Sequence, residues 1–228
     1  MRKGFTLVEL SIVLVIIGLL IGGILVAQSM INTARIEGVI RTIGQYDAAV
    51  ANFRTKFNAL PADNTLLHGC ITVSSCNDGL VDEHYEAGYF WSDLSQGVGL
   101  MNSQGTAYVP FDPFSTNDPT KMPGLNIDQP SPASGNFLIP YSDTPSGPMN
   151  WRFESGAVAT GGGAMLPKDN LALDIKMDDG IANTGNVQGI NGTCNSGSNY
   201  NLTSTAYSCI GYINVGVTNG IANSGGAN

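Results

Sequence analysis

The chain has 228 residues, a formal net charge of −8 at pH 7 and 43% hydrophobic residues. This length suffices for one domain with a long helix, or for at most two small domains. Residues 58–228 carry fifteen acidic side chains against four basic ones, and an acidic surface repels phosphate backbones, which argues against nucleic-acid binding by this part of the chain.

The first element predicted along the chain is an apolar helix that crosses a membrane. Residues 10–34 contain no charged side chain, and their first eighteen residues would span roughly 27 Å as a helix, close to the hydrocarbon thickness of a bilayer. A carboxylate in such a segment costs roughly 2.5–3.5 kcal/mol or more, so Glu9 is a candidate functional residue. Arg2 and Lys3 favour a cytoplasmic amino terminus, with the rest of the chain outside the inner membrane.

Three interpretations of this segment compete. It could be an ordinary signal anchor, a secretory signal peptide cleaved near Ala27, or a leader that is cut before the apolar run. The run is longer than the usual signal-peptide core of roughly 7–15 residues, and a signal peptide has no use for a carboxylate at its start. A generic anchor explains the length of the run but not the spacing of Gly4, Phe5 and Glu9.

The sequence Lys-Gly-Phe-Thr-Leu-Val-Glu at residues 3–9 resembles the processing site of type IV pilins and type II secretion pseudopilins. This resemblance implies that residues 1–4 are a leader, which a prepilin peptidase removes by cutting after Gly4 before it methylates Phe5. It also implies that Glu9 of one subunit pairs with the Phe5 amine of its neighbour during assembly. Such pairing offsets the desolvation cost that each charge would otherwise bear alone.

Two glycines within the membrane segment, predicted at about residues 7–27, are candidates for helix packing. Gly18 and Gly22 form a small-xxx-small pair, which permits close approach of helices from two subunits. Glycine is also simply common in transmembrane helices, and the sequence does not separate the two explanations.

The same helix is predicted to continue beyond the membrane, so that it covers residues 5–57. Apolar residues recur every three or four positions from Ile36 to Phe57, which predicts one buried stripe. Pro61 cannot continue a helix and marks its end. The Leu-Pro pair followed by a small residue and Asp resembles the helix-ending segment of many pseudopilins, although that family often has Gly where this chain has Ala62.

Residues 58–228 are predicted to form a globular head outside the membrane. A second helix is expected within residues 80–100, and nine prolines within residues 110–148 predict a long irregular segment. Strands are predicted at residues 137–141, 149–154, 171–177 and 209–215. Together with the resemblance, these elements predict an α+β, pilin-like fold: a long helix packed on a small antiparallel sheet with long loops.

The four cysteines are expected to form disulfides. Cys70 and Cys76 enclose one short loop and Cys194 and Cys209 another, so local pairing is the simplest of three connectivities. The compartment outside the inner membrane is oxidising and permits disulfides. Free or metal-bound thiols are the alternative, but the spacings do not suit a zinc site.

The densest group of side-chain oxygens consists of four residues near the carboxyl end: Asp174, Asp178, Asp179 and Asn183. Calcium takes six to eight oxygen ligands, and major pseudopilins of type II secretion are known as a class to hold calcium in a loop near the carboxyl end. The spacing does not match an EF-hand, however, and Asp-Asp-Gly is ordinary turn chemistry after a strand. We therefore expect a plain turn, with calcium as the alternative and no other cofactor.

The sequence predicts a structural subunit rather than an enzyme. No Ser or Cys lies in a recognisable nucleophile motif, and no glycine-rich loop has the form that binds phosphate. The resemblance implies a subunit that polymerises with other pilin-like subunits on a secretion or pilus assembly platform in the inner membrane. The alternatives are a low-abundance tip subunit whose loops bind a ligand, a surface or DNA, and an anchored periplasmic enzyme that shares the leader.

Overall fold

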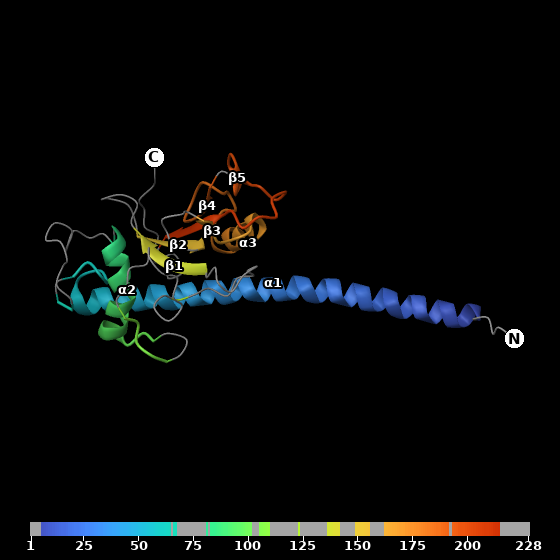
Figure 1. The fold of residues 1–228 in the computed structure, drawn as a ribbon, viewed down its shortest axis with the longest axis horizontal. Helices are drawn as coiled ribbons and strands as arrows, with labels where there is room; N and C mark the ends of the chain where they lie inside the picture. Colours follow the sequence, from blue (N-terminus) through green and yellow to red (C-terminus); the bar gives the residue numbers. More distant parts are fainter. Residues whose placement is uncertain are drawn as a thin grey trace.

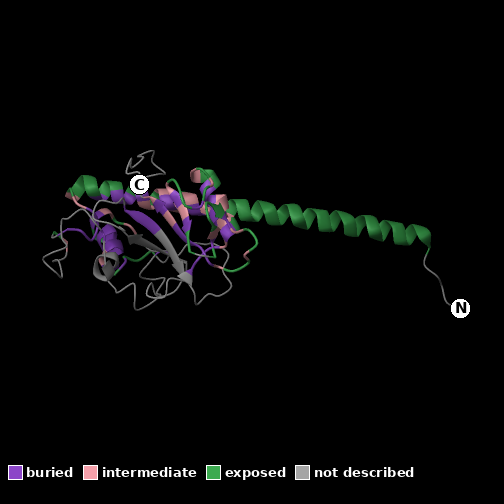
Figure 2. Ribbon diagram, turned by 90° about the horizontal axis from the view of Figure 1, so that it is seen from above, coloured by how far each residue is buried: buried purple, intermediate pink, exposed green. Residues whose placement is uncertain are grey.

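One long helix organises the molecule. The computed structural model describes residues 6–64, 66–67, 81, 83–101, 105–109, 123, 136–141, 149–155, 162–191 and 193–214. Helix α1 (Leu7–Phe57) is 51 residues long, and the other described elements gather along its carboxyl-terminal half (Figure 1). Its amino-terminal half projects away from them, and every residue of that half from Thr6 to Ala34 is exposed (Figure 2).

Within the head, α1 buries one stripe, as the periodicity predicts. The fully or nearly fully buried apolar residues of this stripe are Ile36, Val39, Ile43, Val50 and Phe53. The helix ends at Asn58, which adopts a left-handed conformation (φ 53°) and donates its N–H to the Arg54 carbonyl at 2.8 Å. The last turn also carries Arg54 and Lys56, whose charges complement the negative end of the helix dipole.

Helix α2 (Glu83–Val98) is fastened to the segment that follows α1. The buried Asp93 carboxylate accepts hydrogen bonds from the Ala62 N–H at 2.8 Å and from the Asn64 side-chain amide at 2.6 Å. Ala62 has a φ of 72°, a left-handed conformation that costs a residue with a Cβ roughly 1–2 kcal/mol. The chain therefore tolerates strain where glycine would have none, because Asp93 fixes the local backbone.

The sheet is antiparallel and small. It consists of β1 (Asn136–Tyr141), β2 (Asn150–Ser155), β3 (Gly162–Gly163), β4 (Val187–Ile190) and β7 (Ile210–Asn214). Their order is β1-β2-β7-β4, and β3 also pairs with β2. Pro140 lies on β1 at the edge of the sheet, where a missing backbone donor is tolerated. Three of the four predicted strands thus exist, and β5 (Asn195–Ser196) and β6 (Asn199–Tyr200) form a separate hairpin.

The strand predicted at residues 171–177 is wrong, because this segment belongs to helix α3 (Pro167–Met177). Its leucines and isoleucine alternate with other residues, which imitates a strand, but Ile175 is 62% exposed. The buried positions are Pro167, Asn170, Leu173 and Asp174, which follow helical spacing. Two of these four residues are polar, so a pattern counted on apolar residues alone misses the helix.

An aromatic cluster joins the sheet and α2 to α1. Trp151 on β2 stacks on Trp91 of α2, with ring centroids 5.6 Å apart, and Tyr46 of α1 meets the edge of Trp91 at 5.0 Å. The indole N–H of Trp151 donates to the buried Asp47 carboxylate of α1 at 2.7 Å. This charge-assisted hydrogen bond fixes the sheet against one side of α1.

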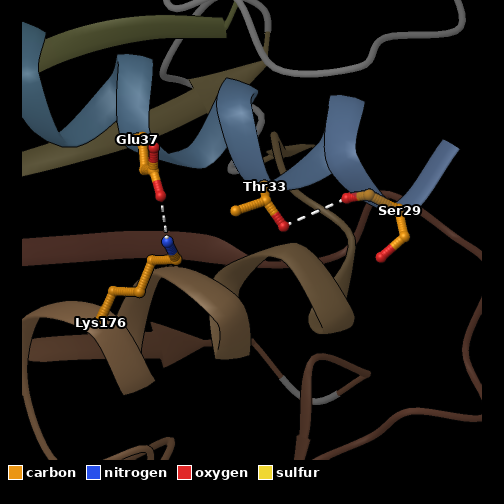
Figure 3. Close-up of polar contacts among 4 residues, drawn as sticks. All are labelled: Ser29, Thr33, Glu37 and Lys176. Atoms are coloured by element: carbon orange, nitrogen blue, oxygen red, sulfur yellow. Dashed lines mark hydrogen bonds and ion pairs between the residues drawn. The ribbon is translucent and has the colours of Figure 1, made fainter. Parts of the chain in front are cut away.

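Helix α3 reaches α1 nearer to the projecting half. The Lys176 ammonium pairs with the Glu37 carboxylate at 2.8 Å (Figure 3). One turn before Glu37, the Thr33 hydroxyl donates to the Ser29 carbonyl at 3.1 Å within the helix (Figure 3). The folded head therefore begins at about Ile36, and residues 6–34 of the chain before it are all exposed.

Candidate functional site: the amino-terminal helix and its first turn

The projecting half of α1 has an apolar surface that is exposed, because no other described residues pack against it. It includes Leu7, Leu19 and Leu25, each more than 60% exposed, and it is long and apolar enough to cross a membrane by length and composition. A soluble protein rarely exposes so large a continuous apolar surface to water. An apolar surface of this kind is suited to contact with lipid or with other apolar helices.

Glu9 forms a capping box with Thr6 at the start of α1. The Thr6 N–H and hydroxyl both donate to Glu9 Oε2, at 2.8 Å and 2.9 Å, and the Glu9 N–H donates to the Thr6 hydroxyl at 3.3 Å. The carboxylate is held over the first turn, where the helix dipole favours a negative charge. Our sequence reasoning missed Thr6, although a Thr followed three residues later by Glu is the signature of a capping box.

The structure describes the two glycines of the predicted packing site but not the residues of the predicted processing site. Gly4 and Phe5 lie outside the described residues. Gly18 and Gly22 are exposed, and no atom lies within 4 Å of the position that a Cβ would take at either of them. Since a helix turns about 100° per residue, Gly18 lies about half a turn away from Glu9. Gly18 and Glu9 therefore face opposite sides of α1 and can contact different neighbours.

One predicted disulfide is present near the carboxyl end. Cys194 and Cys209 are joined, with their Cα atoms 4.7 Å apart, and both are buried. This is the local pairing that the spacing favours, and it links the β5–β6 hairpin to the segment before β7. Cys70 and Cys76 lie outside the described residues.

The predicted oxygen cluster is also assembled, at the end of α3. One carboxylate oxygen each of Asp174, Asp178 and Asp179 lies within 4.8 Å of the others, and Asn183 follows as an exposed residue of the same loop. Because α3 is a helix, this loop follows a helix and not the strand that we predicted.

Each of the three carboxylates already accepts hydrogen bonds from other residues of the head. Asp174 accepts from the Tyr200 hydroxyl at 2.7 Å and from the Gly180 N–H at 2.9 Å. Asp179 accepts from the N–H of the residue two positions later and from the hydroxyl of Thr184, both at 2.8 Å. Burial raises the pKa of the Asp174 carboxyl, against the opposing effect of the Tyr200 hydrogen bond.

The third carboxylate fixes the loop to the start of β4. Asp178 Oδ2 accepts hydrogen bonds from the Asn186 N–H and, at 3.2 Å, from the Val187 N–H. The three carboxylates thus already shape a turn between α3 and β4, as we expect. Calcium takes six to eight oxygen ligands, which include backbone carbonyls and water, and its binding beside these carboxylates stays the alternative prediction.

Replacing Asp178 by alanine should lower the free energy of unfolding by about 1–3 kcal/mol, because two backbone donors lose their acceptor. We expect this loss in a buffer that contains a calcium chelator, measured by thermal unfolding of the head. Asn183→Ala is the matched control from the same loop and should have little effect. A rise in the melting temperature with calcium that Asp178→Ala abolishes would contradict the plain turn and favour a calcium site.

Comparison with known proteins identifies only the amino-terminal part of the chain. Residues 1–25 match the model of the prokaryotic N-terminal methylation motif, which is the signature of type IV pilins and pseudopilins. No curated protein and no solved structure matches the chain. The matched residues include Gly4, Phe5 and Glu9, so the motif covers the predicted processing site and the first turns of α1.

Proposed function

We propose that this chain, which carries the amino-terminal signature of type IV pilins and pseudopilins, is a structural subunit of a pilus or pseudopilus. A prepilin peptidase cuts it after Gly4 and methylates Phe5, and the subunit then polymerises through α1. The observation that carries this proposal is that the motif runs directly into a helix of 51 residues whose first half is apolar and uncovered, while its second half holds the head.

The exposed half of α1 suits two successive environments. Before assembly it lies in the lipid, which covers its apolar side chains. After assembly the same side chains pack against the helices of other subunits, and hydrophobicity alone does not favour one of these states because lipid tails are equally apolar. Close packing and polar pairing must therefore drive the transfer, and Glu9 is the one charged residue in this segment that can provide the pairing.

The expected topology places the amino terminus in the cytoplasm and the head outside the inner membrane. Two observations support this orientation. The basic residues Arg2 and Lys3 precede the apolar segment, as the positive-inside rule requires. The disulfide between Cys194 and Cys209 fits an oxidising compartment for the head.

A low-abundance subunit at the filament tip is the second candidate. The chain has 171 residues after α1, which is large for a simple shaft subunit and leaves room for loops that bind a ligand or a surface. A shaft subunit and a tip subunit share the same processing and the same helix. They differ in stoichiometry, which filament composition reveals.

The test is to express the full chain with a prepilin peptidase and an assembly platform, and to analyse the membrane fraction and the sheared filaments by intact mass. We expect a chain in both fractions that begins at Phe5 with one added methyl group and retains the whole of α1. Abundance comparable to that of the other filament proteins indicates a shaft subunit, and a trace amount indicates a tip subunit. Residues 1–4 still attached in filaments, or loss of the apolar segment, would contradict the proposal.

A further inference from the structure

The carboxyl-terminal part of the head contains an uncharged segment that a disulfide encloses. Residues 180–228 carry no charged side chain. Within them, the Cys194–Cys209 disulfide encloses the β5–β6 hairpin and the loop of residues 201–208 that follows it. In Figure 1 the hairpin lies away from α1, with α3 between them. A group attached beside this hairpin would therefore leave α1 free to pack against other subunits.

The loop after the hairpin carries an acceptor sequence for N-linked glycosylation. Asn201, Leu202 and Thr203 form the sequence Asn-x-Thr, and the middle residue is not proline. Oligosaccharyltransferases attach a glycan to the Asn of this sequence in the surface loops of exported proteins. A sequence this short is not sufficient by itself, so the structure of the loop decides whether it is a suitable acceptor.

The structure presents these three residues at the surface. Leu202 is 59% exposed, Thr203 is also exposed, and Asn201 is partly exposed. They lie in neither a helix nor a strand, and the Ser204 N–H closes a turn by donating to the Asn201 carbonyl at 3.1 Å. Because the buried Tyr200 anchors the chain just before this turn, the acceptor sequence stands on a fixed base and faces the solvent.

The hydroxyl that the acceptor sequence requires already contacts the Asn side chain. Thr203 Oγ1 donates to Asn201 Oδ1 at 2.6 Å. A hydrogen bond to an amide oxygen polarises the amide and makes its N–H groups more acidic, which favours a reaction in which the nitrogen loses a proton. Asn201 Nδ2 itself donates to the Thr193 carbonyl at 3.3 Å, a long hydrogen bond that a binding enzyme can replace.

We propose that Asn201 is an N-glycosylation site that takes an oligosaccharide from a polyprenyl diphosphate carrier. This inference rests on the proposed function, because the expected topology places the head on the side of the membrane where oligosaccharyltransferases act. In the reaction, Asn201 Nδ2 forms a bond to the anomeric carbon of the first sugar, and the bond from that carbon to the diphosphate oxygen breaks. The nitrogen gives one proton to a base of the transferase, and the polyprenyl diphosphate leaves with the bonding electron pair.

A second sequence of the same form, at residues 191–193, is not expected to be used. Asn191 has a φ of 133°, a conformation that is rare for residues other than glycine, so its surroundings must hold it there. Its carbonyl accepts the Cys194 N–H at 2.9 Å, and Cys194 is buried in the disulfide. An acceptor must adapt its backbone to the transferase, and the backbone of Asn191 is held next to a covalent link.

The test uses the full chain, expressed with a prepilin peptidase, an oligosaccharyltransferase that accepts Asn-x-Thr, and a polyprenyl diphosphate-linked oligosaccharide of known mass. We expect the intact mass of the chain to increase by one oligosaccharide, and peptide mapping to place it on Asn201. Asn201→Gln should abolish the increase. Thr203→Ser keeps the hydroxyl and should retain the glycan, whereas Thr203→Val keeps the shape without the hydroxyl and should lose it.

Three controls separate the acceptor role from general effects. Thr193→Val disrupts the second sequence but keeps the carbonyl that contacts Asn201, and it should leave the glycan unchanged. Thr203→Val and the parent chain, both expressed without the transferase, should unfold at similar temperatures, which excludes misfolding as the cause of a lost glycan. A reference acceptor protein in the same cells establishes that the transferase and its donor are active.

The outcomes distinguish this inference from the proposed function. If the chain begins at Phe5 but carries no glycan while the reference acceptor is modified, the acceptor role of Asn201 is wrong and the proposed function stands. A glycan on Asn191 instead of Asn201, or an equal amount of glycan on Thr203→Val, also overturns the inference. If the chain carries the glycan on Asn201 but retains residues 1–4, the proposed function fails and the acceptor site stands.

Discussion

Replacing Glu9 by glutamine is expected to leave the chain inserted in the membrane but to remove it from filaments. Glutamine keeps a side-chain oxygen that can accept the hydrogen bonds from Thr6, so the first turn of α1 remains capped. It lacks the charge that would pair with the amine of a neighbouring Phe5. Without that partner the amine of the neighbour stays uncompensated in a medium of low dielectric constant, which disfavours the assembled state.

The measurement is the distribution of the variant between the membrane fraction and the sheared filament fraction. We expect unchanged or increased membrane insertion, because a costly charge has been removed, and no detectable filament protein. Glu9→Ala removes both the charge and the acceptor of the two Thr6 hydrogen bonds, so equal defects in the two variants identify the charge as the cause.

Ser11→Ala provides a matched control in the same part of α1. Among the described residues, the Ser11 hydroxyl donates to the Val8 carbonyl within the helix, so its removal takes away a polar group but no charge. This variant should assemble like the parent chain. Normal assembly of Glu9→Gln would contradict the role of charge pairing, and failure of Ser11→Ala would show that any polar loss in this segment is disruptive.

The long helix could be predicted from the sequence because its signals are strong and repeated. Apolar residues recur at helical spacing from Ile36 to Phe53, and the structure buries these residues. Helix α3 could not be predicted in this way, because Asn170 and Asp174 occupy two of its buried positions. Their burial depends on partners such as the Tyr200 hydroxyl, which is 26 residues from Asp174 in the sequence.

In the candidate site and the head, contacts between residues that are close in the sequence could be predicted, whereas contacts between distant residues could not. The Thr6–Glu9 capping box and the Cys194–Cys209 disulfide follow from short spacings. The pairing of Glu37 with Lys176 joins residues that are 139 positions apart. Nothing in the local sequence of Glu37 indicates that partner, since it depends on how the head folds back onto α1.

Replacing Gly4 by valine is expected to stop processing altogether, according to the motif that residues 1–25 match. The resemblance implies that the peptidase requires a small residue before the cut. The branched side chain of valine is larger than such a residue, so we expect the peptidase not to accept it. The uncut chain keeps an amide at Phe5 instead of a free amine. Glu9 of the neighbour then has no cation to pair with, so filaments should be absent even though Glu9 is intact.

Intact mass of the membrane fraction measures this result directly, since the precursor retains residues 1–4 and carries no methyl group. Gly4→Ala is the matched control, and its smaller side chain should still permit cleavage and assembly. Adding Glu9→Gln to Gly4→Val should cause no further loss of filaments, because the first change already removes the partner of the second. A mature chain beginning at Phe5 in Gly4→Val would contradict the assignment of the leader, and filaments built from the uncut chain would show that assembly does not depend on the Phe5 amine.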